Sequence, residues 1–351
     1  MNKNETCINV RDLKIHFPTR GGLLGKVSGW TKAVDGVSFT VKRGEVFAIV
    51  GESGCGKTTA AQAVMGLLRP TSGGIEINTE EGSSSGKNPK IWEKLSAKER
   101  KNLRREMQIV FQDPYSSLNP RMTVRSILEE PLIIHGLGSQ KEIYARIDEL
   151  LDQVGLSKSY LERYPHEFSG GQRQRIGIAR SLATAPKIII ADEPVSALDV
   201  SIQAQIINLL QDMQTKYNQT LLFISHDLAV VRHIANRVAV MYQGKIMETG
   251  SDSQIFSSTL HPYTELLLKS VPAINKSKNA DNVPVDKCQN ESGGILKSEN
   301  SGCGFYPRCP ARAERCRKER PELEDFGNGH LAACFNRRET NGAAPTASLP
   351  L

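Results

Sequence analysis

The sequence predicts an α/β protein built around a mainly parallel β-sheet. Apolar runs of strand length occur at 46–50, 188–191 and 220–225. A helical pattern, residues 201–217, separates the last two, and a glycine-rich loop followed by another helical pattern comes after the first. Strands that alternate with helices in this way are typical of parallel sheets, because each crossover helix returns the chain to the same end of the sheet.

Composition is that of an ordinary soluble protein, with 39% hydrophobic, 24% charged and 6% aromatic residues in a chain of 351. No apolar run approaches the roughly 20 residues needed to cross a bilayer, and no apolar secretory segment follows Met1. We therefore expect a cytoplasmic protein. The net charge of +7 comes from lysines and arginines interspersed with acids, which favours a solvated surface over a nucleic-acid interface.

The elements are expected in the following order. Residues 8–50 alternate apolar and polar positions and predict several short strands, interrupted by a loop over 20–32. Strands and a Gly/Ser loop are expected over 70–90, and mostly helices over 121–185. The composition of 273–301 indicates a disordered linker, and a compact cysteine-containing tail follows at 302–336. No internal repeat occurs, so the chain should hold one nucleotide-binding unit.

A phosphate-binding loop is predicted at 51–59, "GESGCGKTT", which fits G-x-x-x-x-G-K-[ST] between a strand and a helix. The glycines allow backbone N–H groups to turn inward around phosphates. Lys57 would reach the β- and γ-phosphates, and Thr58 would offer its hydroxyl to Mg²⁺. The expected nucleotide-binding residues of this loop are Gly51, Glu52, Ser53, Gly54, Cys55, Gly56, Lys57, Thr58 and Thr59.

Polar side chains follow three of the apolar strands. Asp192 and Glu193 end the strand at 188–191, where Asp192 could meet Mg²⁺ and Glu193 could act as general base. His226 follows the strand at 220–225, and Gln112 follows another apolar run. Taken singly, the acids could cap a helix, the histidine could be a hydrogen-bonded polar residue, and the glutamine indicates little.

A second anion-binding site, separate from the phosphate-binding loop, is predicted at "EFSGGQRQRIGIARSL", residues 167–182. Ser169 and two glycines begin a long amphipathic helix there, which leaves backbone N–H groups free to bind an anion.

Six motifs, "GESGCGKTT", "FQDP", "FSGGQRQR", "IIIADEP", "SALD" and "ISHD", occur in the order seen in ATP-binding cassette (ABC) ATPases, which residues 8–256 resemble. The resemblance implies a P-loop NTPase fold with an N-terminal antiparallel β subdomain and a helical subdomain at about 117–182. It also implies that two cassettes stack head to tail. Each ATP would lie between the phosphate-binding loop of one cassette and the signature, "SGGQ" at residues 169–172, of the other.

The resemblance assigns roles residue by residue. Asp192, with Thr58 and Gln112, would serve the Mg²⁺, Glu193 would be the hydrolytic base, and His226 the switch histidine. Lys57, Gln112, Glu193 and His226 form the implied catalytic set, and Asp199 of "SALD" would communicate across the dimer. The partner's ATP would bind Ser169, Gly170, Gly171 and Gln172.

The adenine platform is less defined. Phe17, after "DLKI", is the expected aromatic residue, and Trp30 is the alternative because the insertion between them blurs the alignment. Both could instead be packing residues.

A finer resemblance, to the dipeptide/oligopeptide subfamily of bacterial importers, rests on "YPHEFSGGQRQRIGIARSL", "ADEPVSALDVSIQAQIINLL", "HPYT" (261–264) and the cysteine-containing tail. It implies a peripheral ATPase on the cytoplasmic face of the inner membrane, paired with a second ATPase in a heterodimer or a homodimer. Two permeases and an extracytoplasmic solute-binding protein would complete the importer. The chain departs from the subfamily at 274–301 and at 78–93.

Other functions share parts of this pattern. The cargo could be glutathione, nickel or another small solute, since closely related ATPases serve them. A soluble ABC ATPase acting on nucleic acid would usually have two cassettes or long insertions, and neither is seen. A small-molecule kinase would leave "SGGQ" unexplained.

The tail carries four cysteines whose spacing contains no C-x₂-C pair, so it is not that of a zinc ribbon: Cys303, Cys309, Cys316 and Cys334. Four thiolates can hold a [4Fe–4S] cluster or a zinc ion, or can pack as small hydrophobic groups. The importer resemblance favours the cluster, whose role would be to fold a short tail lacking its own core. Residues 257–301 are expected to be an extension and linker, and 337–351 a disordered end.

Overall fold

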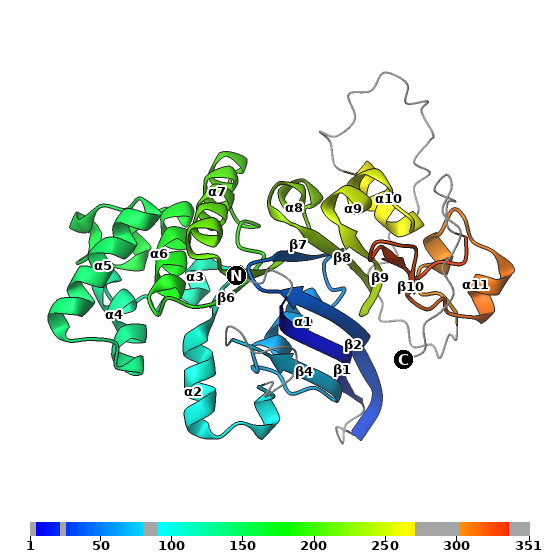
Figure 1. Ribbon diagram of the computed structural model, residues 1–351, viewed down its shortest axis with the longest axis horizontal. Helices are drawn as coiled ribbons and strands as arrows, with labels where there is room; N and C mark the ends of the chain where they lie inside the picture. The colour runs from blue at the N-terminus through cyan, green and yellow to red at the C-terminus, as the bar shows by residue number, and fades with distance from the viewer. Residues whose placement is uncertain (1–4, 22–25, 80–89, 271–301, 337–351) are drawn as a thin grey trace.

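The structure, a computed structural model, describes residues 5–21, 26–79, 90–270 and 302–336. Its core is an eight-stranded sheet in the order β10-β11-β9-β8-β3-β7-β6-β5 (Figure 1). The pairs from β8 through β5 are parallel and the pairs from β8 through β10 are antiparallel. The strands are β3 (Val46–Val50), β5 (Met107–Val110), β6 (Ile188–Asp192), β7 (Thr220–Ser225), β8 (Arg237–Tyr242), β9 (Lys245–Ser251), β10 (Glu324–Asp325) and β11 (Leu331–Ala332).

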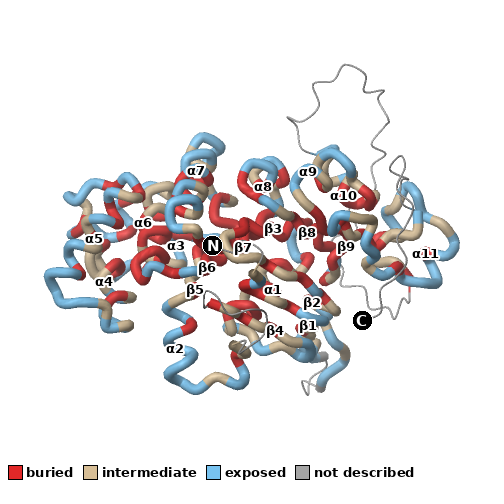
Figure 2. Tube along the Cα trace, viewed as in Figure 1, coloured by how far each residue is buried: buried red, intermediate tan, exposed pale blue. Residues whose placement is uncertain are grey.

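The central strands are buried on both faces, which explains why they read as continuous apolar runs (Figure 2). In β3, Val46, Ala48 and Val50 join a hydrophobic cluster that includes the helices of the α4–α8 side. Phe47 and Ile49 point the other way, into a second cluster with α1 and the N-terminal sheet. Alternation along each strand therefore divides the core into two layers around one sheet.

A separate antiparallel sheet, in the order β2-β1-β4, covers the second layer. Its strands are β1 (Thr6–Gly21), β2 (Lys26–Lys42) and β4 (Ser72–Ile77). The loop expected over 20–32 is wrong for most of its length, because β1 and β2 remain paired to Gly21 and Lys26. The ladder supplies backbone hydrogen bonds that outweigh the poor strand propensity of Gly29.

The helical part lies at the opposite end of the molecule from residues 302–336 (Figure 1). Local signals set its boundaries: Ser139 and Glu142 form a capping box, and Gly136 and Gly155 end helices in the left-handed conformation. Its helices are α3 (Pro114–Ser117), α4 (Val124–His135), α5 (Gln140–Val154), α6 (Gly170–Leu182) and the short turns Lys158–Tyr160 and Pro165–Glu167.

Further helices connect the strands. They are α1 (Lys57–Val64), α2 (Ala97–Glu106), α7 (Val200–Tyr217), α8 (Leu228–Ile234), α9 (Asp252–Ser257), α10 (Pro262–Lys269), α11 (Glu314–Lys318) and the short turns Trp92–Lys94 and Tyr306–Arg308. Within the described ranges, no helix combines the length and apolar character needed to cross a membrane. The predicted linker at 273–301 and tail at 337–351 lie outside the described residues, as does most of the predicted Gly/Ser loop.

The cysteine-containing residues 302–336, here called the C-terminal module, continue the core sheet. Leu331 and Ala332 of β11 pair with β9, and β10 pairs with β11. The fully buried carboxylate of Glu248, on β9, accepts hydrogen bonds from the backbone N–H groups of Leu260 and His261 and contacts His330 Nε2 at 2.8 Å. One buried acid thus ties α10 and the module to the sheet.

His261 generates a prediction about acid stability. Burial lowers the pKa of His261 to about 4, from 6.5, and its Nδ1 accepts the N–H of Tyr263 at the start of α10. The neutral ring therefore contributes stability above pH 6.5 that is lost as the pH falls towards 4. His261→Asn keeps an acceptor for the cap without titrating in this range. Between pH 7.5 and 4.5, the wild type should lose about 2–3 kcal/mol more unfolding free energy than the variant in urea titrations. Equal losses would contradict the prediction.

Candidate nucleotide-binding site

The phosphate loop, residues 51–56, joins β3 to α1 at the carboxyl edge of the parallel strands. Two glycines are sterically required there, because a Cβ at Gly51 would overlap the carbonyl oxygen of Met241 and one at Gly56 would overlap that of Ala33. Both have positive φ, 156° and 104°. Lys57 is buried, and its Nζ donates to the carbonyl oxygens of Gly51 and Glu52 at 2.8 and 3.0 Å.

The other predicted catalytic residues all contact the carboxylate of Glu193. Its Oε2 accepts from Gln112 Nε2 at 3.1 Å and lies 3.0 Å from His226 Nδ1. Its Oε1 forms an ion pair with Lys57 Nζ at 3.8 Å. The structure thus brings Gln112, Glu193, His226 and Lys57 into one group. They come from the ends of β5, β6 and β7 and from the start of α1, elements far apart in the chain.

The backbone of Glu193 is held in an uncommon conformation, with φ at 46°. Its N–H donates to Ile224 O on β7 at 2.9 Å, which fixes the turn after β6. A left-handed backbone at a non-glycine residue is strained and persists only where neighbours determine it. The conformational strain at Glu193 is consistent with a carboxylate that must be held in one orientation.

Asp192, the last residue of β6, is 5% exposed, and its Oδ1 accepts from the Thr58 hydroxyl at 3.0 Å. Burial, with a smaller contribution from the neighbouring Glu193 charge, raises the pKa of Asp192, while Thr58 and Lys57 oppose that rise. A buried carboxylate beside a second acid is stabilised by a nearby cation. The hydroxyl and carboxylate oxygens are also ligand types that Mg²⁺ prefers, so the two residues fit the predicted metal.

The signature residues form a separate, outward-facing surface. Ser169 caps α6: it accepts from the Gln172 N–H, and its own N–H donates to Gln172 Oε1 at 3.0 Å. Ser169 is exposed and Gly170 and Gly171 are partly so. No hydrogen bond among the described residues joins these four positions to the phosphate loop.

Asp199 lies beside this surface, at the start of α7. It is exposed, and the next residue, Val200, is 81% exposed, the most exposed large hydrophobic residue in the described part of the chain. A Cβ at Gly171 would lie 2.5 Å from Ile202 Cγ2, so only glycine permits this close packing of α6 on α7. The geometry fixes the signature relative to the Asp199 segment.

The aromatic candidates lie on paired strands. Phe17 is opposite Thr31 and Trp30 is opposite Pro18, and both rings are exposed, by 41% and 58%. Ala33, whose backbone packs against Gly56, follows Trp30 by three residues and follows Thr31, the residue paired with Phe17, by two. The structure therefore leaves both residues as candidates for stacking on a base.

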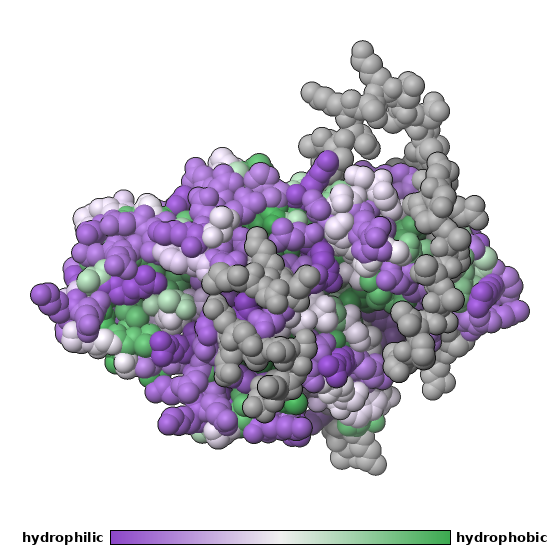
Figure 3. Space-filling model, in the orientation of Figure 1, coloured by the Kyte–Doolittle hydropathy of each residue, from purple (hydrophilic) through white to green (hydrophobic). Residues whose placement is uncertain are grey.

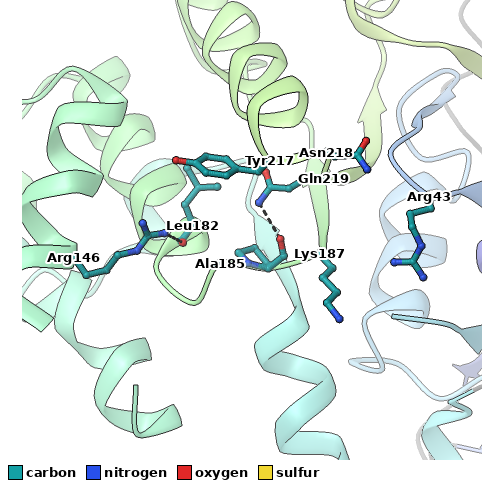
Figure 4. A pocket seen from close by; sticks show the side chains of 9 residues that line it. Arg43, Arg146, Leu182, Ala185, Lys187, Tyr217, Asn218 and Gln219 are labelled. Atoms are coloured by element: carbon teal, nitrogen blue, oxygen red, sulfur yellow. Dashed lines mark hydrogen bonds between the residues drawn. The ribbon is translucent and has the colours of Figure 1, made fainter. Parts of the chain in front are cut away.

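A cavity of about 300 Å³ occupies a different place (Figure 4). It lies at the amino-terminal end of β6 and β7, beside the chain reversal after α6, and not at the edge that carries the phosphate loop. Its lining residues are Arg43, Arg146, Leu182, Ala185, Pro186, Lys187, Tyr217, Asn218 and Gln219. This cavity is therefore separate from the predicted catalytic residues.

The four tail cysteines are free thiols. Burial, and to a smaller extent the charges of Cys309, Cys303 and Cys316, raise the pKa of Cys334 to about 11. Yet the part of the chain that the structure describes contains no group of three or more His, Cys, Asp or Glu side chains placed to hold a metal ion. Neither the [4Fe–4S] cluster nor zinc is supported by this geometry.

Sequence reasoning missed two residues that contact the phosphate loop, Tyr263 and Arg308. Tyr263 OH accepts from the N–H of Glu52 at 3.0 Å, and Arg308 pairs with the Glu52 carboxylate. Tyr263 lies in "HPYT", which indicated the importer resemblance but no role at the site, and nothing around Arg308 indicates one, because only the fold brings both residues there.

A phosphate loop beside a polar strand-end cluster, with a separate serine-capped signature helix, defines the class of ATP-binding cassettes. Solved cassettes share the architecture. A dimeric cassette in a post-hydrolysis state with ADP and Pi aligns with a TM-score of 0.60 and 28% identity over 70% of this chain and 98% of that one. CbiO1 from Clostridium perfringens, part of an ABC transporter complex, aligns with a TM-score of 0.60 and 29% identity over 73% of this chain and 93% of CbiO1. The predicted α/β cassette fold is confirmed, whereas these structures do not test the cysteine-containing tail.

Family comparisons are more specific. The ABC transporter family matches residues 34–196, and the C-terminal region of oligopeptide/dipeptide transporters matches residues 247–316. The chain is 48% identical to the oligopeptide transport ATP-binding protein AppF of Bacillus subtilis, over 94% of this chain and 97% of AppF. It is 44% identical to the dipeptide transport ATP-binding protein DppF of Haemophilus influenzae, over 95% and 98%. The chain therefore belongs to the ABC transporter family, among ATP-binding proteins of this kind, which confirms the resemblance.

The adenine platform yields a prediction. Phe17→Ala should weaken ATP binding about tenfold, because base stacking on an aromatic ring contributes roughly 1–1.5 kcal/mol. Trp30→Ala should change the affinity less than about twofold. Competition against a fluorescent nucleotide measures both, with circular dichroism as the control for folding. The reverse ranking would assign the stacking to Trp30.

Proposed function

We propose that this protein is the ATP-hydrolysing subunit of an importer for dipeptides or oligopeptides. The observation that carries the proposal is the convergence of Lys57, Gln112 and His226 on the Glu193 carboxylate. The proposal is supported further by relatives named as oligopeptide and dipeptide transport ATP-binding proteins, which align along nearly all of the chain.

Glu193 is the proposed general base. Its carboxylate, held by Gln112 and His226, would accept a proton from the water that attacks the γ-phosphate. When ATP binds, Lys57 would exchange the carbonyl oxygens of Gly51 and Glu52 for the β- and γ-phosphates. His226, whose side chain is half exposed, would then be free to bind the γ-phosphate.

Thr58 and Asp192, with Gln112, would hold the Mg²⁺. The ion supplies charge neutralisation on the β- and γ-phosphate oxygens. The hydrogen bond from Thr58 to Asp192 already places the hydroxyl and carboxylate side by side.

The signature residues would complete the site of a second cassette. Ser169 and the N–H groups of Gly170, Gly171 and Gln172 would bind the γ-phosphate that the partner's loop holds. Asp199 and the exposed Val200 would lie in the same interface and communicate between the two sites. The partner could be a second, unequal ATPase or another copy of this chain, and we favour the former from the importer resemblance.

Two permeases would dock on the helical part of the protein, on the cytoplasmic side of the inner membrane, and a solute-binding protein would deliver the cargo outside. Exposed apolar side chains support a docking surface there. Figure 3 shows them gathered over the α4 end of the molecule, where Ile133 and Ile134 are 58% and 53% exposed. Tyr115, on α3, is 62% exposed.

Glu193→Gln tests the proposed function. The variant should bind ATP with unchanged affinity, lose at least about a hundredfold in turnover and accumulate as a closed dimer, since only the base is lost. In cells lacking the chromosomal copy, wild type should restore growth on defined dipeptides or oligopeptides and the variant should not. Unchanged hydrolysis would remove Glu193 from the base role, and growth restored by neither protein would contradict peptide import.

The cysteines are proposed to hold a [4Fe–4S] cluster, with zinc as the alternative. The proposal rests on the importer resemblance alone, because the described residues form no group placed to hold a metal ion. Cys303, Cys309, Cys316 and Cys334 would be the ligands, and the cluster would fold the C-terminal module without contacting ATP.

Anaerobic purification tests this proposal. Iron and acid-labile sulfide should each approach about four per chain, with a visible absorption that Cys316→Ala removes. Stoichiometric zinc without sulfide would select the alternative. Protein without either metal would show that the cysteines pack as small hydrophobic groups.

A further inference from the structure

The C-terminal module reaches the phosphate loop directly. Arg308, in the turn Tyr306–Arg308, donates from Nη1 and Nη2 to Glu52 Oε2 and Oε1, both at 2.8 Å. This bidentate pair joins residues 256 positions apart. Two parallel charge-assisted hydrogen bonds fix direction as well as distance, which a single contact between flexible side chains does not.

A second contact reaches the same residue from α10. The Glu52 N–H donates to the hydroxyl of Tyr263 at 3.0 Å, and Tyr263 is fully buried. Burial raises the pKa of Tyr263, so the phenol stays neutral while its oxygen accepts this hydrogen bond.

An aromatic cluster makes these two contacts one unit. The rings of Tyr242, at the end of β8, Tyr263 and Phe305 lie 4.7 to 5.4 Å apart in tilted and edge-on arrangements. Phe305 is fully buried and lies three residues before Arg308. The cluster therefore seats the Arg308 turn on the core sheet beside the phosphate loop.

Glu52 needs such anchors for two reasons. Its carbonyl oxygen is held by Lys57 in the structure, and the proposed mechanism withdraws that lysine to the phosphates. It is also the sole acid in the loop "GESGCGKTT", and an unpaired carboxylate beside a triphosphate lowers ATP affinity by charge repulsion. Arg308 neutralises and orients the carboxylate, and Tyr263 holds the backbone.

We propose that Arg308 and Tyr263 are positioning residues of the phosphate loop, through which the C-terminal module sets the affinity of the cassette for ATP. The proposal rests on the proposed function, since it concerns the same ATP site. It assigns the module a role in nucleotide binding that is separate from any role of its cysteines.

The test compares Arg308→Ala with a matched control, Arg317→Ala, in the full-length protein. Arg317 is an exposed cation of the same module, on α11. Arg308→Ala should raise the Kd and KM for ATP about fivefold to tenfold with kcat changed less than about twofold, because the loop is misplaced but the base is intact. Arg317→Ala should leave all three values unchanged. Arg308→Lys should restore part of the affinity, and Tyr263→Phe should weaken it in the same direction.

A double-mutant cycle identifies the partner. In a Glu52→Gln background, Arg308→Ala should have an effect at least about threefold smaller, because the charge that it neutralises is gone. An unchanged Kd in Arg308→Ala, or an equal effect in both backgrounds, would overturn the inference. A fall in kcat with unchanged KM would indicate general disruption and would also overturn it. Failure of the wild type to bind ATP would instead overturn the proposed function.

Discussion

One buried carboxylate organises this protein. Glu193 accepts a hydrogen bond from Gln112, contacts His226 and pairs with Lys57, so it connects three strand ends and the phosphate loop. Such a group is possible because parallel strands deliver their carboxyl ends to one edge of the sheet. That convergence carries local conformational costs. One is the left-handed backbone at Glu193. Another is the need for glycine where the carbonyl oxygens of Met241 and Ala33 pack against the loop.

Because the Glu193 group lies at one edge of the sheet, the signature residues form a second, separate surface. The edge that carries Lys57 and Glu193 holds the phosphate loop, whereas Ser169 and the N–H groups after it lie on another part of the fold and are exposed or partly exposed. Close packing of Gly171 on Ile202 holds that second surface in a fixed relation to Asp199. A further layer, the C-terminal module, is joined to the sheet by β11 and by Glu248 and reaches the loop through Arg308.

Local motifs predicted the fold class and the members of the Glu193 group, because each motif combines a buried strand with a polar residue at its tip. Other features depend on distant parts of the chain. The loop expected over 20–32 was wrong because its glycines hid a ladder that only the partner strand completes. The register of that ladder places Phe17 opposite Thr31 and Trp30 opposite Pro18, and both rings are exposed, so the register does not select between them. Arg308 and Glu52 could not have been paired from one sequence, since neither residue carries a local sign of the other.

The central claim is that each ATP lies between two subunits, half of its binding surface coming from each. It is tested by ATP retention in tagged dimers that carry Glu193→Gln in both subunits. Lys57→Ala and Ser169→Arg are placed either on separate subunits or together on one. Shared sites predict that the separate arrangement keeps one occupied site and the joint arrangement keeps none. Retention by the joint arrangement and loss from the separate one would mean that every subunit binds its nucleotide alone.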